Sequence, residues 1–515
     1  MSIFLYKVIF KLIVKLKKNE SIQFDPKELN FGLINFNNQS KIKTVYWKIN
    51  DFSSKLKDDK SLLYHSFEWL NYAKKMGGAS NIKNANFALN KWIFTNNSVY
   101  TSLWSLNLIS SRFVNVIYNL NFISLLFDEK LKKKIFKFLY LHFLLMNHGI
   151  KKNLSNANIS DLKALFLGSC IYNRGINKSI KLIDILITEQ VDSLGFHKSY
   201  NALEQAIFIN HLHEIKNISL FFKIPGSKKL IFQINNMISV MQNLFHQDKS
   251  LILFNGSRNS NLIEVNKVLN LTKDIVPKKI NSNEKGIVFY RDEQKSIFMD
   301  IVKPVNKKIN NTIHASTLAF ELSCLGEKII TNCGSINREI INENDYLRYS
   351  AAHSTIIVNN TNISELNKKS YRRVPDKITF SKQDEENFIS WTSSHNGYIK
   401  NYKKIVTRKI KIMKNKNEII GEDSILSTKS NSEKILYHIR FHLMPNCNCI
   451  LTNNKKTAII RIKDQSWLLK TSSLISMEDS IYVNNENKIQ QTKQLVLTGY
   501  ISDRKKIENW IITKS

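Results

Sequence analysis

The hydrophobic positions in the first half of the chain repeat every three to four residues. This spacing runs from Lys60 to about Phe245 and is interrupted by a single proline, Pro225, which predicts several consecutive α-helices. Ser160 is the expected N-cap of one of them, because an apolar stripe follows it. The pattern therefore indicates an all-helical domain of helical hairpins over residues 60–250.

The pattern changes near residue 286 to short runs in which apolar and polar residues alternate. Such runs are typical of β-strands with one packed and one solvated face, and the pairs Asn396-Gly397 and Asn453-Asn454 are typical turns between them. The clearest expected strands are Ile405–Met413, Ile435–Leu443, Thr457–Ile462, Trp467–Lys470 and Gln494–Thr498. We predict an antiparallel β-sandwich over residues 286–515, preceded by a linker over residues 251–285 that also begins the sandwich. The predicted fold class is thus α+β, with several domains.

The first 18 residues carry a pattern of their own. Lysines recur every three to four positions from Lys7 to Lys18, while apolar residues such as Val8 and Leu12 share another face, which predicts a basic amphipathic helix. This helix is expected either to lie on an anionic membrane surface or to dock on its own domain. Lysines interrupt its apolar centre, so it does not read as an ordinary signal peptide, and it permits a cytoplasmic or peripheral inner-membrane location. We expect no transmembrane helix, because no run of about 20 apolar residues occurs.

The charge of the chain is strongly unbalanced. Its 76 lysines and arginines exceed its 42 acidic residues and give a net charge of +34, which favours a polyanionic partner. An alternative is that an AT-rich coding sequence has filled the surface with lysine and asparagine. The five cysteines lack zinc-finger spacing and no RNP-like aromatic motif is found, so we expect no nucleic-acid partner.

Strand-like runs, glycine turns and two histidines come together in Thr312–Leu366. Apolar residues alternate over Leu318–Leu322, and Thr355–Val358 is a β-branched run, so the stretch reads as adjacent antiparallel strands. The turns between these strands are expected to bring His314 and His353 close together.

The motifs of this stretch resemble the C-terminal domain of the heparinase II/III family of polysaccharide lyases. In the family's order and spacing, they are His314-Ala315-Ser316, Leu318–Leu322, Asn332-Cys333-Gly334, Arg348 and Ala351–Thr355. Leu253–Gly256 and Arg440–Pro445 extend the resemblance, which covers roughly the whole chain after residue 60. The resemblance implies an incomplete α/α toroid for the helical region, followed by a heparinase II/III-like β-sandwich.

The resemblance also implies an activity. Members of the family are bacterial carbon–oxygen lyases that cleave acidic, uronate-containing glycans such as glycosaminoglycans by β-elimination, commonly in the cell envelope or periplasm. The partner would then be an acidic polysaccharide, and no metal is required for the chemistry. The alternative is a catalytically altered member that binds acidic polysaccharide in envelope or capsule metabolism, because Thr312, Ser316 and Asn332 stand where the family has His, Asp and Asp.

Elimination from a uronate needs a group that neutralises the carboxylate, a base at C5 and an acid at the leaving oxygen. By resemblance, Asn147 and His148 are placed for carboxylate neutralisation and proton abstraction, and Tyr200 occupies the position of the catalytic Tyr. His197 is a candidate substrate contact on the same loop as Tyr200. A structural alternative for Asn147 and His148 is the last turn of a helix, with Gly149 just beyond its end.

Two further candidates precede His353 on one loop. Arg348 could bind a carboxylate or sulfate with two parallel hydrogen bonds, and Tyr349 could serve as the catalytic acid.

Related lyases hold a structural zinc with a His, an Asp and a His. The corresponding residues here are His314, Asn332 and His353, and the family's additional His, two residues before the first ligand, is replaced by Thr312. A neutral Asn in place of Asp weakens zinc binding, so a metal-free cluster is the alternative to a structural zinc site.

Overall fold

The computed structural model describes most of the chain beyond residue 61. The described ranges are 62–96, 102–152, 154–225, 228–259, 262–271, 286–304, 306–336, 346–367, 370–429, 434–502 and 504–515. The predicted amphipathic helix of residues 1–18 lies outside them. Across these ranges no helix is long and apolar enough to span a membrane.

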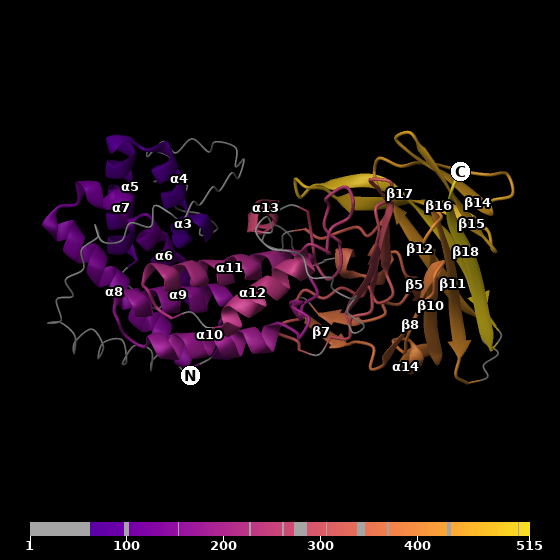
Figure 1. Ribbon diagram of the computed structural model, residues 1–515, viewed down its shortest axis with the longest axis horizontal. Coiled ribbons are helices and arrows are strands. Elements are labelled where there is room, and N and C mark those ends of the chain that lie inside the picture. Colours follow the sequence, from indigo (N-terminus) through magenta and orange to yellow (C-terminus); the bar gives the residue numbers. More distant parts are fainter. Residues whose placement is uncertain are drawn as a thin grey trace. The chain divides into compact units, whose positions relative to one another are not determined.

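Helices fill the described chain up to residue 271. They are α3 (Leu62–Ser66), α4 (Trp69–Met76), α5 (Gly78–Thr95), α6 (Leu106–Tyr118), α7 (Leu120–Ile123), α8 (Glu129–Lys152), α9 (Ile159–Ile171), α10 (Ile176–Gln190), α11 (Ala202–Phe221), α12 (Lys228–Met241) and α13 (Leu262–Leu271). Helix α6 packs against both α8 and α9, as Figure 1 shows. The helical region predicted from the three-to-four residue spacing is confirmed.

The start of α9 differs from the prediction by two residues. Asn158, not Ser160, is the N-cap: its Oδ1 accepts a hydrogen bond from the Asp161 backbone N–H at 2.9 Å, and Asp161 Oδ2 accepts from the Asn158 N–H at 3.1 Å. The backbone of Asn158 is extended, whereas Ser160 already lies inside the helix. The reciprocal pair satisfies two N–H groups that a helix start leaves open, which a serine at position 160 could not do.

The chain beyond residue 286 is built from antiparallel strands. They are β1 (Ile287–Arg291), β2 (Lys295–Asp300), β3 (Phe320–Cys324), β4 (Glu327–Thr331), β5 (Ile356–Val358), β6 (Glu365–Asn367), β7 (Ser370–Arg373), β8 (Ile378–Asp384), β9 (Phe388–His395), β10 (Lys404–Met413), β11 (Glu418–Ser427), β12 (Ile435–Leu443), β13 (Asn448–Leu451), β14 (Thr457–Ile462), β15 (Gln465–Thr471), β16 (Ile475–Val483), β17 (Ile489–Ile501) and β18 (Lys505–Lys514). The predicted strands Ile435–Leu443 and Thr457–Ile462 coincide with β12 and β14.

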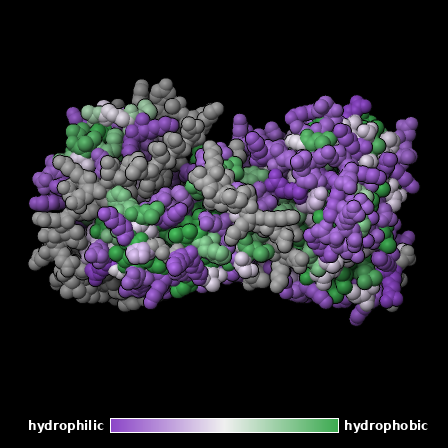
Figure 2. Space-filling model, in the orientation of Figure 1, coloured by the Kyte–Doolittle hydropathy of each residue, from purple (hydrophilic) through white to green (hydrophobic). Residues whose placement is uncertain are grey.

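Among the described residues these strands form two large sheets and one small one. The first runs β1-β2-β3-β4-β12-β17-β16, with β5 also paired to β12, and the second runs β13-β14-β15-β18-β11-β10-β9-β8. Strands β6 and β7 make a separate pair. Buried and more exposed positions alternate along β10, as expected for a strand with one packed face. The visible face of this region is mostly hydrophilic (Figure 2). The predicted α+β fold class is therefore confirmed.

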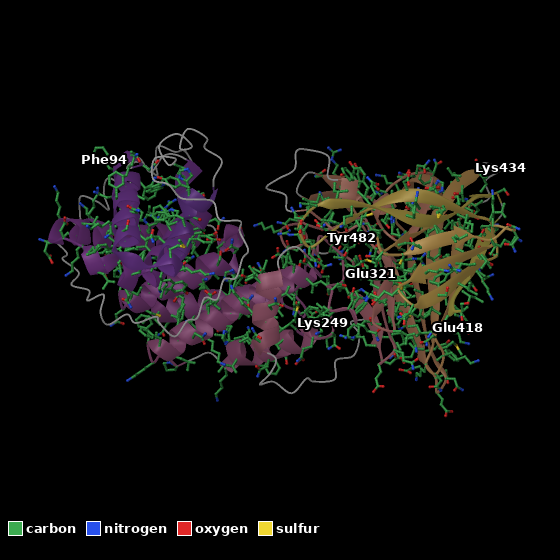
Figure 3. The ribbon with its side chains drawn as sticks, turned by 90° about the horizontal axis from the view of Figure 1, so that it is seen from above. Phe94, Lys249, Glu321, Glu418, Lys434 and Tyr482 are labelled. Atoms are coloured by element: carbon green, nitrogen blue, oxygen red, sulfur yellow. The ribbon has the colours of Figure 1, made fainter. Side chains whose placement is uncertain are left out.

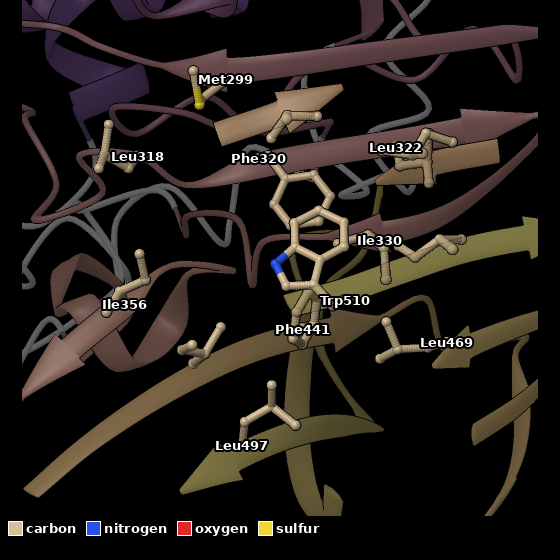
Figure 4. Close-up of a cluster of buried hydrophobic side chains, with 14 of the residues drawn as sticks. Met299, Leu318, Phe320, Leu322, Ile330, Ile356, Phe441, Leu469, Leu497 and Trp510 are labelled. Atoms are coloured by element: carbon tan, nitrogen blue, oxygen red, sulfur yellow. The ribbon is translucent and has the colours of Figure 1, made fainter. Parts of the chain in front are cut away.

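Aromatic side chains from both large sheets meet in the core of the β-region. Phe320 of β3 stacks on Trp510 of β18, with ring centroids 5.3 Å apart, and Phe441 of β12 meets Trp510 edge-on at 5.4 Å (Figure 4). All three side chains are at most 1% exposed. Burial of large aromatic surfaces in such contacts is a main source of stability, so these residues hold the two sheets together.

A buried ion pair lies beside this aromatic cluster. Arg408 of β10 donates to both carboxylate oxygens of Asp423 on β11, at 2.7 and 2.8 Å, and both side chains are fully buried. Its Nη1 donates to the carbonyl oxygens of Leu318 and Ser354 at 2.9 and 2.7 Å. Trp510 Nε1 adds a third hydrogen bond to Asp423, at 3.0 Å. Arg408 thus fixes the backbone before β3 and before β5 from the opposite sheet.

The chain divides into two compact units. The helical unit comprises the described residues up to Ile187 together with His211–Ile231, and the β-rich unit comprises Thr188–Asn210 together with Phe232–Ser515. The loop that carries Tyr200 therefore belongs to the β-rich unit, whereas Asn147 belongs to the helical unit.

Candidate functional site

The loop between α10 and α11 is shaped by a few side chains that bond its own backbone. Asp192 Oδ1 accepts from the N–H groups of Leu194 and Phe196, at 3.0 and 2.9 Å, which closes a tight turn. Gln205 of α11 accepts from the His197 N–H at 2.6 Å and donates to the Gly195 carbonyl at 2.8 Å. These bonds fix the segment that leads into Tyr200.

Tyr200 has a strained backbone and a partly exposed ring. Its φ of 52° lies in the left-handed region, which a tyrosine rarely adopts, so its surroundings must hold it there. The ring lies against Gly286, where an added Cβ would come within 2.1 Å of Cε1. The hydroxyl is 3.4 Å from Asp192 Oδ2. The predicted catalytic tyrosine is thus held in one orientation by its own loop and by Gly286.

Asn201 connects this loop to a second one. Its Oδ1 caps α11 by accepting from the Leu203 N–H at 2.9 Å, and its Nδ2 donates to the Asn255 carbonyl at 3.1 Å. The neighbouring Gly256 has a φ of 87°, and a Cβ there would meet Thr312 at 3.2 Å. We define Tyr200, Asn201, Asn255, Gly256 and Thr312 as the Tyr200 site.

Buried polar atoms without partners concentrate beside this site. Within the described ranges, neither Thr312 Oγ1 nor Ser257 Oγ has a hydrogen-bond partner, although both atoms are buried. Asn255, only 1% exposed, has a left-handed φ of 54°. Buried hydroxyls are normally bonded, and strained residues cluster at functional sites, so this arrangement is typical of a place where a ligand or water supplies the missing bonds.

Asp300 lies next to the Tyr200 site, against Asn255. Burial raises the pKa of its carboxyl to about 7, although hydrogen bonds from Ser316 and from the Val302 N–H, and the nearby Asn255 side chain, act in the opposite direction. Ser316 Oγ donates to Asp300 Oδ2 at 2.6 Å. Ser316 stands where the family motif has an Asp. The carboxylate at this place comes instead from Asp300 of β2, to which Ser316 is hydrogen-bonded. Sequence reasoning missed Asp300 and Asn255; the family-like run Leu253–Gly256 was the signal for the latter.

His314 and His353 are in contact, as their turns predicted. His314 Nδ1 and His353 Nε2 are 3.2 Å apart, and the two side chains are at most 2% exposed. Burial is the main cause that lowers the pKa of His353 to about 3, so this imidazole is neutral at neutral pH. The distance is close to the separation that two nitrogen ligands of one tetrahedral zinc would have.

The third predicted zinc ligand is engaged at both ends of its amide. Asn332 Nδ2 donates to Glu321 Oε1 at 2.9 Å, and its Oδ1 accepts from the Ser354 N–H at 2.9 Å. In the part of the chain that the structure describes, no three His, Cys, Asp or Glu side chains gather in a metal-binding group. A neutral, fully hydrogen-bonded amide beside two imidazoles is a poor donor set for zinc, so the residues present do not fit the structural zinc that the resemblance implied.

Glu321 is the negatively charged residue beside Asn332. Its Oε2 accepts from His246 Nε2 and Lys328 Nζ, each at 2.8 Å, and it is fully buried inside the β-rich unit (Figure 3). Burial raises the pKa of Glu321, but the charge of Lys328 and the hydrogen bond from His246 outweigh it and lower the pKa to about 2. Burial beside Lys328 keeps His246 neutral. The carboxylate is therefore ionised, and hydrogen bonds within the protein occupy both of its oxygens. Its role is structural, and it is not available as a metal ligand.

Restoring the family's carboxylate should restore zinc binding. We expect the wild-type chain, dialysed against zinc, to retain well under one zinc per chain, and Asn332→Asp to retain about one, because the third ligand becomes anionic. Elemental analysis of both proteins measures this. Adding His353→Ala to Asn332→Asp should remove the ion again. Stoichiometric zinc in the wild type would contradict the poor fit of the amide.

The predicted substrate contacts Arg348 and His197 are both buried. Arg348 is 2% exposed and donates to the carbonyl oxygens of Ile313 and Asn367, at 3.0 and 2.5 Å. His197 is 7% exposed, and its Nδ1 lies 2.7 Å from Ser199 Oγ. Burial, followed by the charge of Lys198, lowers the pKa of His197 to about 4. These contacts favour roles in holding the Tyr200 loop and the segment before His314 over direct contact with a glycan.

Tyr349, in contrast, is 41% exposed. It lies between two short 3-10 helices, Tyr346–Arg348 and Ser350–Ala352, and its carbonyl accepts from the Ala352 N–H at 2.9 Å. Its side chain is therefore accessible to a substrate, as a catalytic acid must be.

Asn147 and His148 lie inside α8. The helix continues to Lys152, so the structural alternative, a helix end with Gly149 beyond it, is wrong. Both side chains are half-buried. Asn147 lines a pocket of the helical unit together with residues from α9 and from the start of α10. The predicted carboxylate-binding amide thus faces a hollow rather than a packed core.

The chain is similar to a known protein family and to several solved structures. Residues 278–510 match the family model described as heparinase II/III-like, C-terminal. The chain matches no curated protein. Among solved structures it is similar to heparinase III (TM-score 0.72, 13% identity, covering 87% of this chain and 76% of that one), and to the heparan sulfate lyase HepC from Pedobacter heparinus (0.60, 12%, 87% and 76%). Another heparinase III gene product gives a TM-score of 0.67 at 13% identity, over 89% of this chain and 79% of that one. The resemblance inferred from the motifs is confirmed.

Proposed function

Because residues 278–510 form a heparinase II/III-like C-terminal domain, we propose that this protein is a polysaccharide lyase that cleaves an acidic, uronate-containing glycan by β-elimination. The observation that carries the proposal is the Tyr200 site. There the tyrosine of the family position is held in a strained backbone beside the buried, unpartnered hydroxyls of Ser257 and Thr312.

In the proposed reaction the proton at C5 of the uronate leaves, the bond from C4 to the glycosidic oxygen breaks, and a C4–C5 double bond forms. The Asn147 amide would bind the carboxylate and stabilise the charge that develops on it. His148 or Tyr200 would accept the C5 proton. Tyr200 or the accessible Tyr349 would return a proton to the leaving oxygen, so the glycan gains one unsaturated end and one hydroxyl.

The positions at which this chain differs from the family motifs affect whether catalysis is retained. Thr312 replaces the His that faces the substrate in related lyases, and a threonine hydroxyl cannot act as a base near neutral pH. Proton transfer in this chain would therefore depend on His148 and on the tyrosines.

The second candidate function is binding of acidic polysaccharide without cleavage. The specific observation in its favour is that Ser316 and Asn332, which replace two family carboxylates, are hydrogen-bonded to Asp300 and to Glu321, respectively. Neutral side chains that are already hydrogen-bonded within the protein therefore occupy the places of both carboxylates.

Ultraviolet absorbance of 4,5-unsaturated uronate ends separates the two functions. The purified chain should raise the absorbance with at least one of heparan sulfate, chondroitin, alginate or glucuronan. A flat trace across that panel, together with saturable binding of one of these glycans, would establish the binding function instead.

A further inference from the structure

The pocket beside Asn147 has a lining that the proposed elimination does not explain. Its volume is about 160 Å³, and it lies within the helical unit. Three of its lining residues are cationic: Lys151 from α8, Arg174 before α10, and Lys178 in the first turn of α10. None of the three belongs to the motifs that resemble the heparinase II/III family.

The positive charge of this pocket is not neutralised by the protein. Across the described ranges, no ion pair involves Lys151, Arg174 or Lys178, and no acidic residue lines the pocket. Lys178 is exposed, and a small desolvation followed by the charge of the nearby Lys151 lowers its pKa, because the two ammonium groups lie close together. Two positive charges this close repel each other, and an anion bound between them would attract both.

A buried serine and the start of a helix also line the pocket. Ser169 of α9 lines it and is only 2% exposed, and its hydroxyl is a hydrogen-bond donor that an anion in the pocket could use. The first turn of α10 also favours a bound anion, because it follows Gly175, which has no side chain to cap it, and contains no acidic residue.

We propose that this pocket binds a tetrahedral oxyanion, a sulfate or phosphate group. Two ammonium groups, one guanidinium and one hydroxyl from three helical segments surround the space, which suits an acceptor with several oxygens better than a single chloride. Asn147 and Ser179 provide further polar lining. The inference does not depend on the lyase activity, since a sulfated glycan and a phosphorylated compound are both possible sources of the group.

Calorimetric titration of the full chain tests the proposal with a matched pair of ligands. Glucosamine 6-sulfate and glucosamine 6-phosphate present the two oxyanions on the same sugar, and glucosamine in the same sodium chloride background is the blank. We expect saturable binding of at least one ester and none of glucosamine. The ester that binds more tightly identifies the source of the group.

Three variants distinguish binding of the anion in this pocket from non-specific attraction of anions to a basic protein. Lys178→Met should weaken binding at least about tenfold, since it removes a direct charge–anion contact. Ser169→Ala keeps every charge and should still weaken binding severalfold, because it removes the buried donor. Lys181→Met removes another exposed lysine of the same helix, one that does not line the pocket, and should change nothing.

Equal losses in Lys178→Met and Lys181→Met would overturn the proposal, as would unchanged binding in Ser169→Ala or the absence of saturable binding to both esters. Circular dichroism of each variant verifies that α10 and α9 remain folded. Because the readout is binding, a chain without lyase activity is tested equally well.

Discussion

Replacing Tyr200 with phenylalanine is expected to lower kcat for glycan cleavage by about 10²–10⁴-fold, the usual contribution of a positioned proton-transfer group. The ring would still pack against Gly286, so the loop and the fold should remain intact. KM should change little, because the lost hydroxyl acts on the proton in transfer rather than on substrate binding.

Initial rates of unsaturated-uronate formation measure this effect, and a thermal melt of the variant verifies its fold. Tyr346→Phe is the matched control: Tyr346 is 45% exposed, lies three residues before Tyr349 and has no predicted role in catalysis. Its rate should equal that of the wild type. If Tyr200→Phe also keeps the wild-type rate, the acid and base must be sought in His148 and Tyr349 instead.

Replacing Arg408 with methionine is expected to lower the free energy of unfolding by about 3–5 kcal/mol. The variant leaves the Asp423 carboxylate buried and deprived of its bidentate partner. It also removes the donors that hold the carbonyl oxygens of Leu318 and Ser354. An unpaired buried charge is among the most destabilising changes a core can undergo.

Urea denaturation of the two proteins measures the difference. Arg440→Met is a suitable control, because Arg440 pairs at 3.1 Å with Glu478, whose side chain is 41% exposed, and such a pair contributes at most about 1 kcal/mol. Replacing both partners, as Arg408→Met with Asp423→Leu, should recover much of the loss, since no charge is then left buried. A loss in Arg408→Met no larger than in Arg440→Met would contradict the structural role assigned to the pair.

The sequence by itself determined the elements of the fold. Period-two alternation in β12 and β14 is a local property of the backbone, so the predicted bounds coincide with the observed strands. The three-to-four residue spacing likewise located the helices, and the turn residues of Thr312–Leu366 brought His314 and His353 together. The cap of α9 was misplaced by two residues because Asn158 and Ser160 both have side chains that can cap a helix, and only the backbone conformation distinguishes them.

The tertiary structure decided which polar side chains are accessible. Arg348 and Tyr349 are adjacent in sequence, yet one guanidinium is buried against backbone carbonyls while the neighbouring phenol is 41% exposed. The amide of Asn332 was recognisable as a poor zinc ligand from its chemistry, but its two hydrogen bonds depend on Glu321 and Ser354, which reach it only through sheet pairing and the loop before β5. The convergence of Lys151, Arg174 and Lys178 on one pocket depends on how α8, α9 and α10 pack together, which sequence spacing does not encode.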